Sequence, residues 1–528
     1  MSSTTDSSPR SAFASNAVKQ RGADLVARAL ARAGTRYVFA LSGNHVMPLF
    51  DAALDAKLPI VHVRHEAAAV HMADAWGRLT GEVGIALATG GPGHANAVSA
   101  LYTALAAESP VLLLSGHAPL AELGKGSFQE MAQAEMAAPV CKAAWTVRSA
   151  ASLGEDLARA MRMAKAGRPG PVHLSLPSDL LEAGAEAELP AKEDFLPEPA
   201  APRMNAEVLA LLQTAKKPLL IAGPALGNAR GRAQLRQFEE ATCVPCIVME
   251  SPRGANDPGL GLLAEVLAAA DVVVLAGKRR DFTLKFGAAF GPGCRVVETE
   301  GGSIEAGSAG WPKSGWLEEV RSALAFRPAA WQALASKAEG PLHPVEVGRE
   351  VQKLLAAPDA VLVADGGEFG QWSQATLSAP HRLVNGPAGA IGVALPFAAA
   401  AKLARPGSAV VAMLGDGTFG FHAAELDTAV RGGLGYVAVV GNDACWNAEY
   451  QIQLRSYGAA RALGLELLPT RYDQVAAGFG AHGEHVERPA QLAPALERAS
   501  SAARAGRAAC VNVRIERLAA PSYRRAAE

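Results

Sequence analysis

Short apolar runs alternate with amphipathic or alanine-rich stretches along this chain of 528 residues. An apolar run of four to eight residues that is bounded by turn residues is typical of a buried β-strand, and a longer stretch with 3.6-residue periodicity is typical of a helix. Strand-like runs occupy residues 37–41, 60–63, 84–88, 111–115, 219–222, 246–249, 272–276, 295–298, 360–364, 411–414, 436–440 and 509–515. Their alternation with helical stretches predicts an α/β protein with doubly wound parallel sheets.

Composition divides this pattern into three predicted domains. The serine-rich start has the composition of a disordered tail, and a stretch rich in Ala, Glu and Pro has that of a solvated linker. The predicted segments are a tail (1–21), a first domain (22–181), a linker (182–205), a central domain (206–326), a second linker (327–344) and a third domain (345–528). Each domain is expected to contain one parallel sheet.

The overall composition favours an enzyme that acts on small molecules. Half of the residues are hydrophobic, 19% are charged and the formal net charge is −1, so we expect no nucleic-acid partner. No apolar run has the length of a membrane span, and the N-terminus lacks the apolar centre of a secretory signal, so a cytoplasmic protein is expected. Six cysteines form no disulfide pattern, and Cys243 and Cys246 are interpreted as buried thiols in preference to a redox or zinc pair.

The stretch VAMLGDGTFGFHAAELDTAVRGGLGYVAVVGNDACWN, residues 411–447, carries the most informative motif. A strand-like run is followed by the turn Gly415-Asp416-Gly417-Thr418 and then by a segment with apolar residues at Phe421, Leu426 and Val430. In a parallel sheet Asp416 and Asn442, which are 442 − 416 = 26 positions apart, follow neighbouring strands and meet at one edge. Hard oxygen ligands of this kind suit Mg²⁺ beside a phosphate, although a purely structural turn explains a Gly-Asp-Gly sequence equally well.

A second candidate site lies in the first domain. Glu66 follows the strand-like run at 60–63 and begins an alanine-rich helix, and a glycine-rich turn, TGGPGHAN, spans residues 89–96. A glutamate in this position has two interpretations, either a polar group at the carboxyl edge of a sheet or a charge that complements the helix dipole.

Taken together, three segments resemble the thiamine diphosphate (ThDP) enzymes of the acetolactate synthase-like branch: RHEAAAVHMADAWGRLTGEVGIALATGGPGHANAV, the motif at 411–447, and NGPAGAIGVALPFAAAAKLARP. The resemblance implies a pyrimidine-binding domain, a central Rossmann-like domain and a diphosphate-binding domain. It also implies ThDP and Mg²⁺ as cofactors, and a homodimer or homotetramer whose subunits share active sites.

The resemblance assigns a role to each matching residue. Glu66 contacts the aminopyrimidine ring, Gln129 is an active-site-loop glutamine, Gly389 offers its carbonyl to the 4′-amino group, and Ile391 supports the folded cofactor. Asp416, Asn442 and the carbonyl of Ala444 hold the metal, and the turn made by Gly415, Gly417 and Thr418 contacts the diphosphate. The chain departs from the family at Gly441, where a first asparagine is usual, and at Glu368 and Phe369, where Gln-His is usual.

These departures leave several activities open. The first expectation is a lyase or carboligase that acts on small 2-oxoacids, as acetolactate synthases do. The alternative is a 2-hydroxyacyl-CoA lyase that releases formyl-CoA and an aldehyde, which the segments VVLAGKRRDF and GNDACW and the acid-Phe pair resemble. Lys278, Arg279 and Arg280 are then either a phosphate clamp or a solvated edge, and the central domain is a candidate site for FAD or for CoA or ADP. The second alternative is an inactive regulatory subunit.

Overall fold

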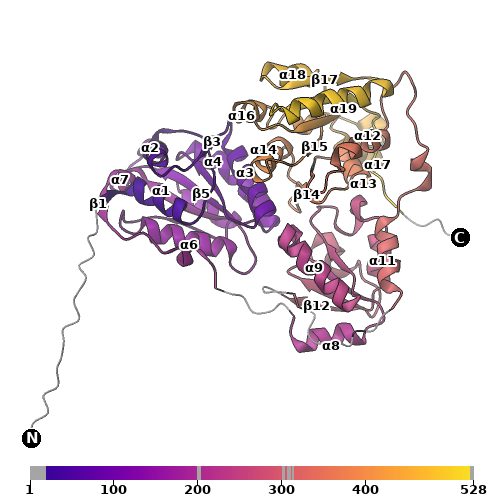
Figure 1. Ribbon diagram of the computed structural model, residues 1–528, viewed down its shortest axis with the longest axis horizontal. Helices are drawn as coiled ribbons and strands as arrows, with labels where there is room; N and C mark the ends of the chain where they lie inside the picture. Colours follow the sequence, from indigo (N-terminus) through magenta and orange to yellow (C-terminus); the bar gives the residue numbers. More distant parts are fainter. Residues whose placement is uncertain (1–18, 199–203, 300–303, 306–310, 312–313, 524–528) are drawn as a thin grey trace, which may run out of the picture.

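The computed structural model describes residues 19–198, 204–299, 304–305, 311 and 314–523, and it contains three parallel sheets, each within its own part of the chain (Figure 1). The prediction of an α/β protein with three parallel-sheet domains is confirmed. None of the helices in the described residues is long and apolar enough to cross a membrane.

The N-terminal sheet has the strand order β3-β2-β4-β5-β7-β6. Its strands are β2 (Val38–Ala40), β3 (Ile60–His62), β4 (Gly84–Ala88), β5 (Val111–His117), β6 (Ala143–Thr146) and β7 (Val172–Pro177). Alternate residues face opposite sides: Val38 packs with α1 (Gly22–Arg32), α2 (Met47–Asp55) and α6 (Leu153–Lys165), while Phe39 packs with α3 (Glu66–Thr80) and α4 (Pro92–Ala106). Both faces are therefore covered, as parallel sheets require.

The central sheet is smaller, with the order β10-β9-β11-β12. Its strands are β9 (Pro218–Ala222), β10 (Cys246–Val248), β11 (Val272–Ala276) and β12 (Arg295–Thr299). The helices α8 (Ala206–Thr214) and α9 (Ala229–Thr242) cover one face, and α10 (Leu263–Ala269) and α11 (Trp316–Ala325) cover the other. Within the described residues, no strand pairs with the edge of β10 that faces away from β9.

The C-terminal sheet has the order β14-β13-β15-β16-β18-β17. Its strands are β13 (Val361–Asp365), β14 (His381–Val384), β15 (Val410–Gly415), β16 (Val437–Asn442), β17 (His482–Val486) and β18 (Ala509–Arg514). One face packs on α12 (Pro344–Gln352) and α19 (Pro489–Arg504), and the other on α14 (Ala394–Ala404) and α16 (Glu425–Arg431). The order change between β13 and β15 leaves a switch point at the carboxyl ends of these strands, where α/β proteins place their sites.

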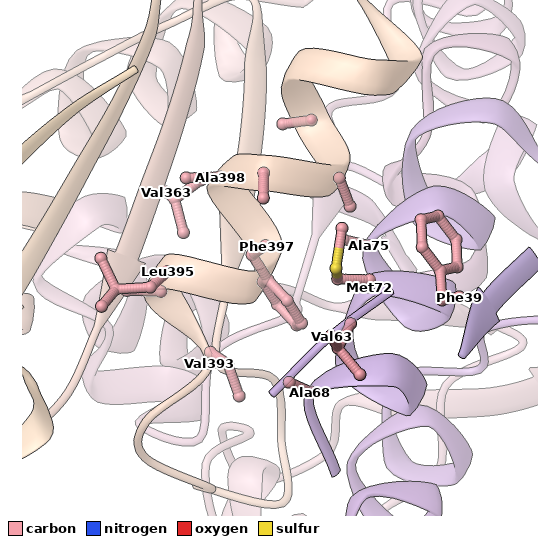
Figure 2. Close-up of a cluster of buried hydrophobic side chains, with 14 of the residues drawn as sticks. Phe39, Val63, Ala68, Met72, Ala75, Val363, Val393, Leu395, Phe397 and Ala398 are labelled. Atoms are coloured by element: carbon pink, nitrogen blue, oxygen red, sulfur yellow. The ribbon is translucent and has the colours of Figure 1, made fainter. Parts of the chain in front are cut away.

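One hydrophobic core joins the first and third domains. Helix α3 lies beside α14, and Figure 2 shows Met72 of α3 facing Phe397 of α14 among small side chains such as Ala68 and Ala398. Small residues let the two helix backbones approach closely, so this contact fixes the position of α3, and with it Glu66, against the third domain.

The chain between the domains is more ordered than its composition predicts. Lys19–Arg21, part of the predicted tail, forms strand β1 and pairs antiparallel with β8 (Gly184–Glu186) in the predicted first linker; residues 1–18 lie outside the described part. Phe195 is buried in the N-terminal core, and Leu342, in the predicted second linker, is buried in the C-terminal core. A few apolar anchors thus attach both segments to the domains, and residues 199–203 lie outside the described part.

Candidate active site

A small polar pocket lies at the carboxyl ends of β13, β15 and β16. It has a volume of about 70 Å³. Its lining includes five of the residues that the resemblance assigned to the cofactor: Ile391, Gly415, Asp416, Gly417 and Thr418. The strand ends therefore bring the Gly-Asp-Gly turn and the loop around Ile391 together.

Two carboxylates face this pocket. Asp416 is 3% exposed, and its Oδ1 and Oδ2 accept hydrogen bonds from the backbone N–H groups of Gly417 (2.8 Å) and Cys445 (3.3 Å). Burial raises the pKa of Asp416 to about 6, and burial together with the charge of Asp416 raises the pKa of Asp443 to about 7. Two adjacent acids that are both costly to ionise form a donor set suited to a divalent cation.

Asn442 and Ala444, which the resemblance assigned to the metal, do not line the pocket. The Asn442 side chain is fully buried, and its Nδ2 donates to the carbonyl of Thr470 (3.0 Å) and to Oδ1 of Asn512 (3.1 Å). The carbonyl of Ala444 accepts from the N–H of Leu467 (2.8 Å). The pocket lining instead contains Asp443, which follows Asn442, and Cys445, which follows Ala444.

Aromatic rings fill the space that two glycines leave. A Cβ on Gly441 would lie 2.4 Å from the ring of Phe369, and a Cβ on Gly417 would lie 2.6 Å from the ring of Trp446. Gly441 and Phe369 both depart from the family pattern, and the ring of Phe369 occupies the space that a side chain at position 441 would need. Both rings line the pocket, so the two departures belong to one packing arrangement.

The buried carboxylate of Asp365 holds the loop that precedes α14. Oδ2 of Asp365 accepts from the N–H groups of Gly392 (3.0 Å) and Ala394 (2.8 Å), and Nδ1 of His422 donates to the carbonyl of Gly392 (2.7 Å). Gly389 in this loop has a φ of +68°, a left-handed conformation that glycine adopts without strain. These contacts fix the loop that presents Ile391 to the pocket.

Glu66 lies in a second polar site, in the N-terminal domain. It begins α3, is 8% exposed, and accepts a hydrogen bond from Nδ2 of Asn96 (3.1 Å). A Cβ on Gly93 would lie 3.2 Å from Oε1 of Glu66, and a Cβ on Gly91 would lie 2.7 Å from the Cβ of Gln129. The glycine turn at 89–93 thus brings the loop of Gln129 close to the site of Glu66.

The two sites remain separate within one chain. Neither Glu66 nor Gln129 lines the pocket of Asp416. The link between them is structural: the N–H of Arg64 donates to Oε1 of Glu425 in α16 (3.0 Å), and the rings of His65 and His422 lie 5.8 Å apart. We refer to the surroundings of Glu66 as the N-terminal half-site and to the pocket of Asp416 as the C-terminal half-site.

The basic cluster of the central domain is largely neutralised. Lys278 is buried and pairs with Asp281 (2.7 Å), and Arg280 pairs with Glu298 (2.6 Å). Arg279 is exposed. Two of the three cations therefore already have carboxylate partners, and this arrangement favours a local structural role over a ready phosphate clamp.

Comparison with known families agrees with this arrangement. Residues 20–136 match the family described as "Thiamine pyrophosphate enzyme, N-terminal TPP binding domain", and residues 365–513 match its "C-terminal TPP binding domain". These ranges contain the N-terminal and C-terminal half-sites respectively. The chain belongs to the thiamine pyrophosphate enzyme family.

Two kinds of relative cover almost the whole chain. The chain is 34% identical to the probable acetolactate synthase of Mycobacterium bovis and to the acetolactate synthase large subunit IlvG of Mycobacterium tuberculosis, with 93% of this chain and 94% of each relative covered. It is 32% identical to 2-hydroxyacyl-CoA lyase 2 of Homo sapiens, with 94% of this chain and 90% of the relative covered. This thiamine pyrophosphate enzyme is thus related to both activities.

The residues of the C-terminal half-site fit the diphosphate end of the cofactor. Two glycines open the turn to a phosphate, and the two carboxylates provide hard oxygen donors for a bridging cation. No group of three or more His, Cys, Asp or Glu side chains suited to a metal occurs in the described part of the chain. A bound diphosphate would share its oxygens with a cation at the two carboxylates. Such sharing is typical of Mg²⁺.

Proposed function

We propose that this enzyme uses thiamine diphosphate and Mg²⁺ to cleave or form C–C bonds in small 2-oxoacids, as an acetolactate synthase does. The observation that supports this reaction is the position of Gln129, whose Cβ is close to Gly91 in the turn beside Glu66. Gln129 has a φ of +58°, a costly conformation for a residue other than glycine. Strain of this kind is typical of a loop that holds a side chain for a site.

Each half-site has its own task in this proposal. Asp416 and Asp443 hold the cation, in place of Asn442 and Ala444. The turn of Gly415, Gly417 and Thr418 receives the diphosphate. Ile391 supports the cofactor from the loop that Asp365 fixes, with Gly389 beside it. Glu66 binds the pyrimidine ring and holds a proton at its ring nitrogen. Thiamine diphosphate, when bound, supplies a nucleophilic carbon and an electron sink.

The separation of the half-sites supports an assembly with shared active sites. Exposed apolar side chains flank both half-sites: Phe128 is 69% exposed near Gln129, and Phe421 is 54% exposed after the Gly-Asp-Gly turn. We propose a homodimer, or a dimer of such dimers, in which Glu66 of one subunit faces Asp416 of the other.

Mixing two inactive variants tests this assembly. Glu66→Gln chains and Asp416→Ala chains are each expected to be inactive, but a mixed dimer contains one intact pair, Glu66 from one subunit and Asp416 from the other. Restored turnover after co-expression supports shared sites. The matched control is the double variant mixed with wild type, whose mixed dimer has one defect in each site. If each site instead lay within one chain, the isolated Glu66→Gln/Asp416→Ala dimer would be inactive and the isolated double-variant/wild-type dimer would be half active, and this result contradicts the proposal.

A second candidate is a 2-hydroxyacyl-CoA lyase. The observation that favours it is the paired packing of Phe369 on Gly441 and of Trp446 on Gly417, because these residues belong to the segments that resemble such lyases. A thioester substrate would make the central domain a CoA site, and FAD would occupy the same domain in a synthase. The neutralised cations at Lys278 and Arg280 weigh against a CoA clamp there.

One substrate panel separates the candidates. Pyruvate, 2-oxobutyrate, benzoylformate and a 2-hydroxyacyl-CoA are each incubated with the enzyme, ThDP and Mg²⁺, and CO₂, acetolactate, aldehyde and formyl-CoA are measured. Acetolactate from pyruvate at roughly 1 to 1000 per second supports the synthase. Formyl-CoA and an aldehyde without CO₂ support the lyase, and neutralising Lys278, Arg279 and Arg280 together should then lower activity only with the thioester. An inactive regulatory subunit would bind neither ThDP nor Mg²⁺ tightly.

A further inference from the structure

A cleft between the central and C-terminal domains contains none of the residues of the two half-sites. It has a volume of about 380 Å³, within the range of small-molecule sites. Its walls come from α9 and the free edge of β10 on one side, and from the end of α13 (Glu368–Thr376) and the edge strand β14 on the other. Figure 1 labels α9, α13 and β14 around this boundary.

Arginine side chains exceed acids in the lining of this cleft. Arg232 and Arg382 share Oε1 of Glu250, at 2.9 and 3.0 Å, and Nη2 of Arg382 also lies 3.7 Å from Oδ2 of the buried Asp257. Arg327 donates to the carbonyl oxygens of Ala375, Leu324, Phe326 and Gly259, and in the part of the chain that the structure describes no carboxylate is among its hydrogen-bond partners. A guanidinium group without a carboxylate partner, such as that of Arg327, favours an anionic ligand.

Glu239, the acidic residue among those that line the cleft, does not balance the positive charge of the arginines. Oε1 of Glu239 accepts from Arg321 (2.8 Å), which does not line the cleft, and its Oε2 accepts from the N–H of Cys246 (2.9 Å). Arg236, one turn after Arg232 on α9, is exposed and has no ion pair or side-chain hydrogen bond among the described residues. Arg236 is therefore the guanidinium most available to a ligand.

A buried amide provides a second, independent observation. Gln374 lines the cleft, is 3% exposed, and its Oε1 has no hydrogen-bond partner among the described residues. A buried acceptor without a donor is costly, so it favours a ligand that brings an N–H or O–H group. Ile247 and Leu377 add apolar walls.

We propose that this cleft binds a small carboxylate that carries a hydroxyl or amine donor and an apolar body. The carboxylate would pair with Arg236, the donor would satisfy Oε1 of Gln374, and the apolar body would contact Ile247 and Leu377. Because the walls come from two domains, the ligand would stabilise their relative position.

Calorimetry on the full-length enzyme, saturated with ThDP and Mg²⁺, tests the proposal with 2-hydroxy-4-methylpentanoate as the probe. We expect saturable binding of one molecule per chain. Arg236→Glu should weaken it by about tenfold or more, because a charge-assisted hydrogen bond is replaced by repulsion. The matched control is Arg230→Glu, an exposed arginine on the same helix outside the lining, which should leave the affinity unchanged.

A second variant tests the donor. Gln374→Leu should reduce the preference for the hydroxy acid over 4-methylpentanoate by roughly three- to tenfold, while the unliganded enzyme keeps or gains thermal stability. The proposal is overturned by an absence of saturable binding at concentrations on the order of 10 mM, or by an Arg236→Glu variant that binds like wild type. An unchanged preference in Gln374→Leu overturns the requirement for a donor.

Discussion

The N-terminal and C-terminal half-sites use the same position in two similar sheets and fill it with different chemistry. Each lies where parallel strands end and a glycine turn begins. The N-terminal half-site contains one carboxylate, Glu66, held by the amide of Asn96. The C-terminal half-site contains two carboxylates, Asp416 and Asp443, close enough that the charge of the first raises the pKa of the second. One half is suited to hold a proton and the other to hold a cation, so substitutions in them should have different effects.

Removal of either carboxylate of the C-terminal half-site should have the largest effect. Asp416→Ala and Asp443→Ala should each weaken cation-dependent ThDP binding by about 100-fold or more, because the cation loses a charged ligand. Titration with Mn²⁺, followed by electron paramagnetic resonance, measures the cation directly. Asn442→Ala is the matched control, and a loss as large as that of Asp443→Ala would show that the asparagine is the ligand after all.

Glu66→Gln should separate chemistry from binding. Turnover should fall by about 10² to 10⁴, because the side chain no longer holds a proton at the pyrimidine, while ThDP affinity changes by roughly threefold or less. Steady-state kinetics and ThDP fluorescence titration measure the two quantities. A variant with wild-type turnover would remove Glu66 from the reaction.

Asp365 should make stability depend on pH. Burial raises its pKa to about 7, so the folded protein keeps a proton that the unfolded chain releases near pH 4. Stability should therefore fall as pH rises from about 4 to 7, by up to about 1.4 kcal/mol per pH unit, and then level off. Asp365→Asn should lack this dependence in urea unfolding at a series of pH values. Parallel curves for the two proteins would contradict the raised pKa.

The packing of Phe369 on Gly441 should give the smallest effect. Gly441→Asn should lower the free energy of unfolding by about 1 to 3 kcal/mol, because its Cβ would lie 2.4 Å from the aromatic ring. Adding Phe369→Ala should recover part of the loss in a double-mutant cycle. Additive losses would mean that the two departures are independent.

Strands were the most predictable part of the fold. Those at Gly84–Ala88 and Val272–Ala276 have the predicted bounds, because buried apolar runs end there at turn residues. The strand Ala143–Thr146 was not predicted, since its residues are only half-buried and its alanines have little strand preference. The predicted helix after Asp416 is divided into α15 (Asp416–Phe419) and α16 (Glu425–Arg431). Leu426 is buried as expected, but Phe421 lies in the break between the two helices and is 54% exposed.

The sequence predicted where the site residues lie along the chain better than it predicted which way their side chains point. Strand spacing correctly placed Asp416 beside the end of β16. It could not show whether Asn442 or Asp443 faces the pocket, because successive side chains of a strand point to opposite sides and the register at a strand end depends on the whole sheet. The adjacent carboxylate Asp443 was the available signal, since an acid next to a metal motif is itself a candidate ligand.

The contact between α3 and α14 has a consequence for how the chain acquires its structure. Ala394 follows Thr80 by 394 − 80 = 314 positions, yet the helices that these residues bound share one core (Figure 2). This core cannot form until the ribosome has released most of the chain, and its many long-range contacts favour slow folding. Until then α3 lacks the partner helix that covers its alanine-rich face in the folded chain, and this face remains exposed to solvent.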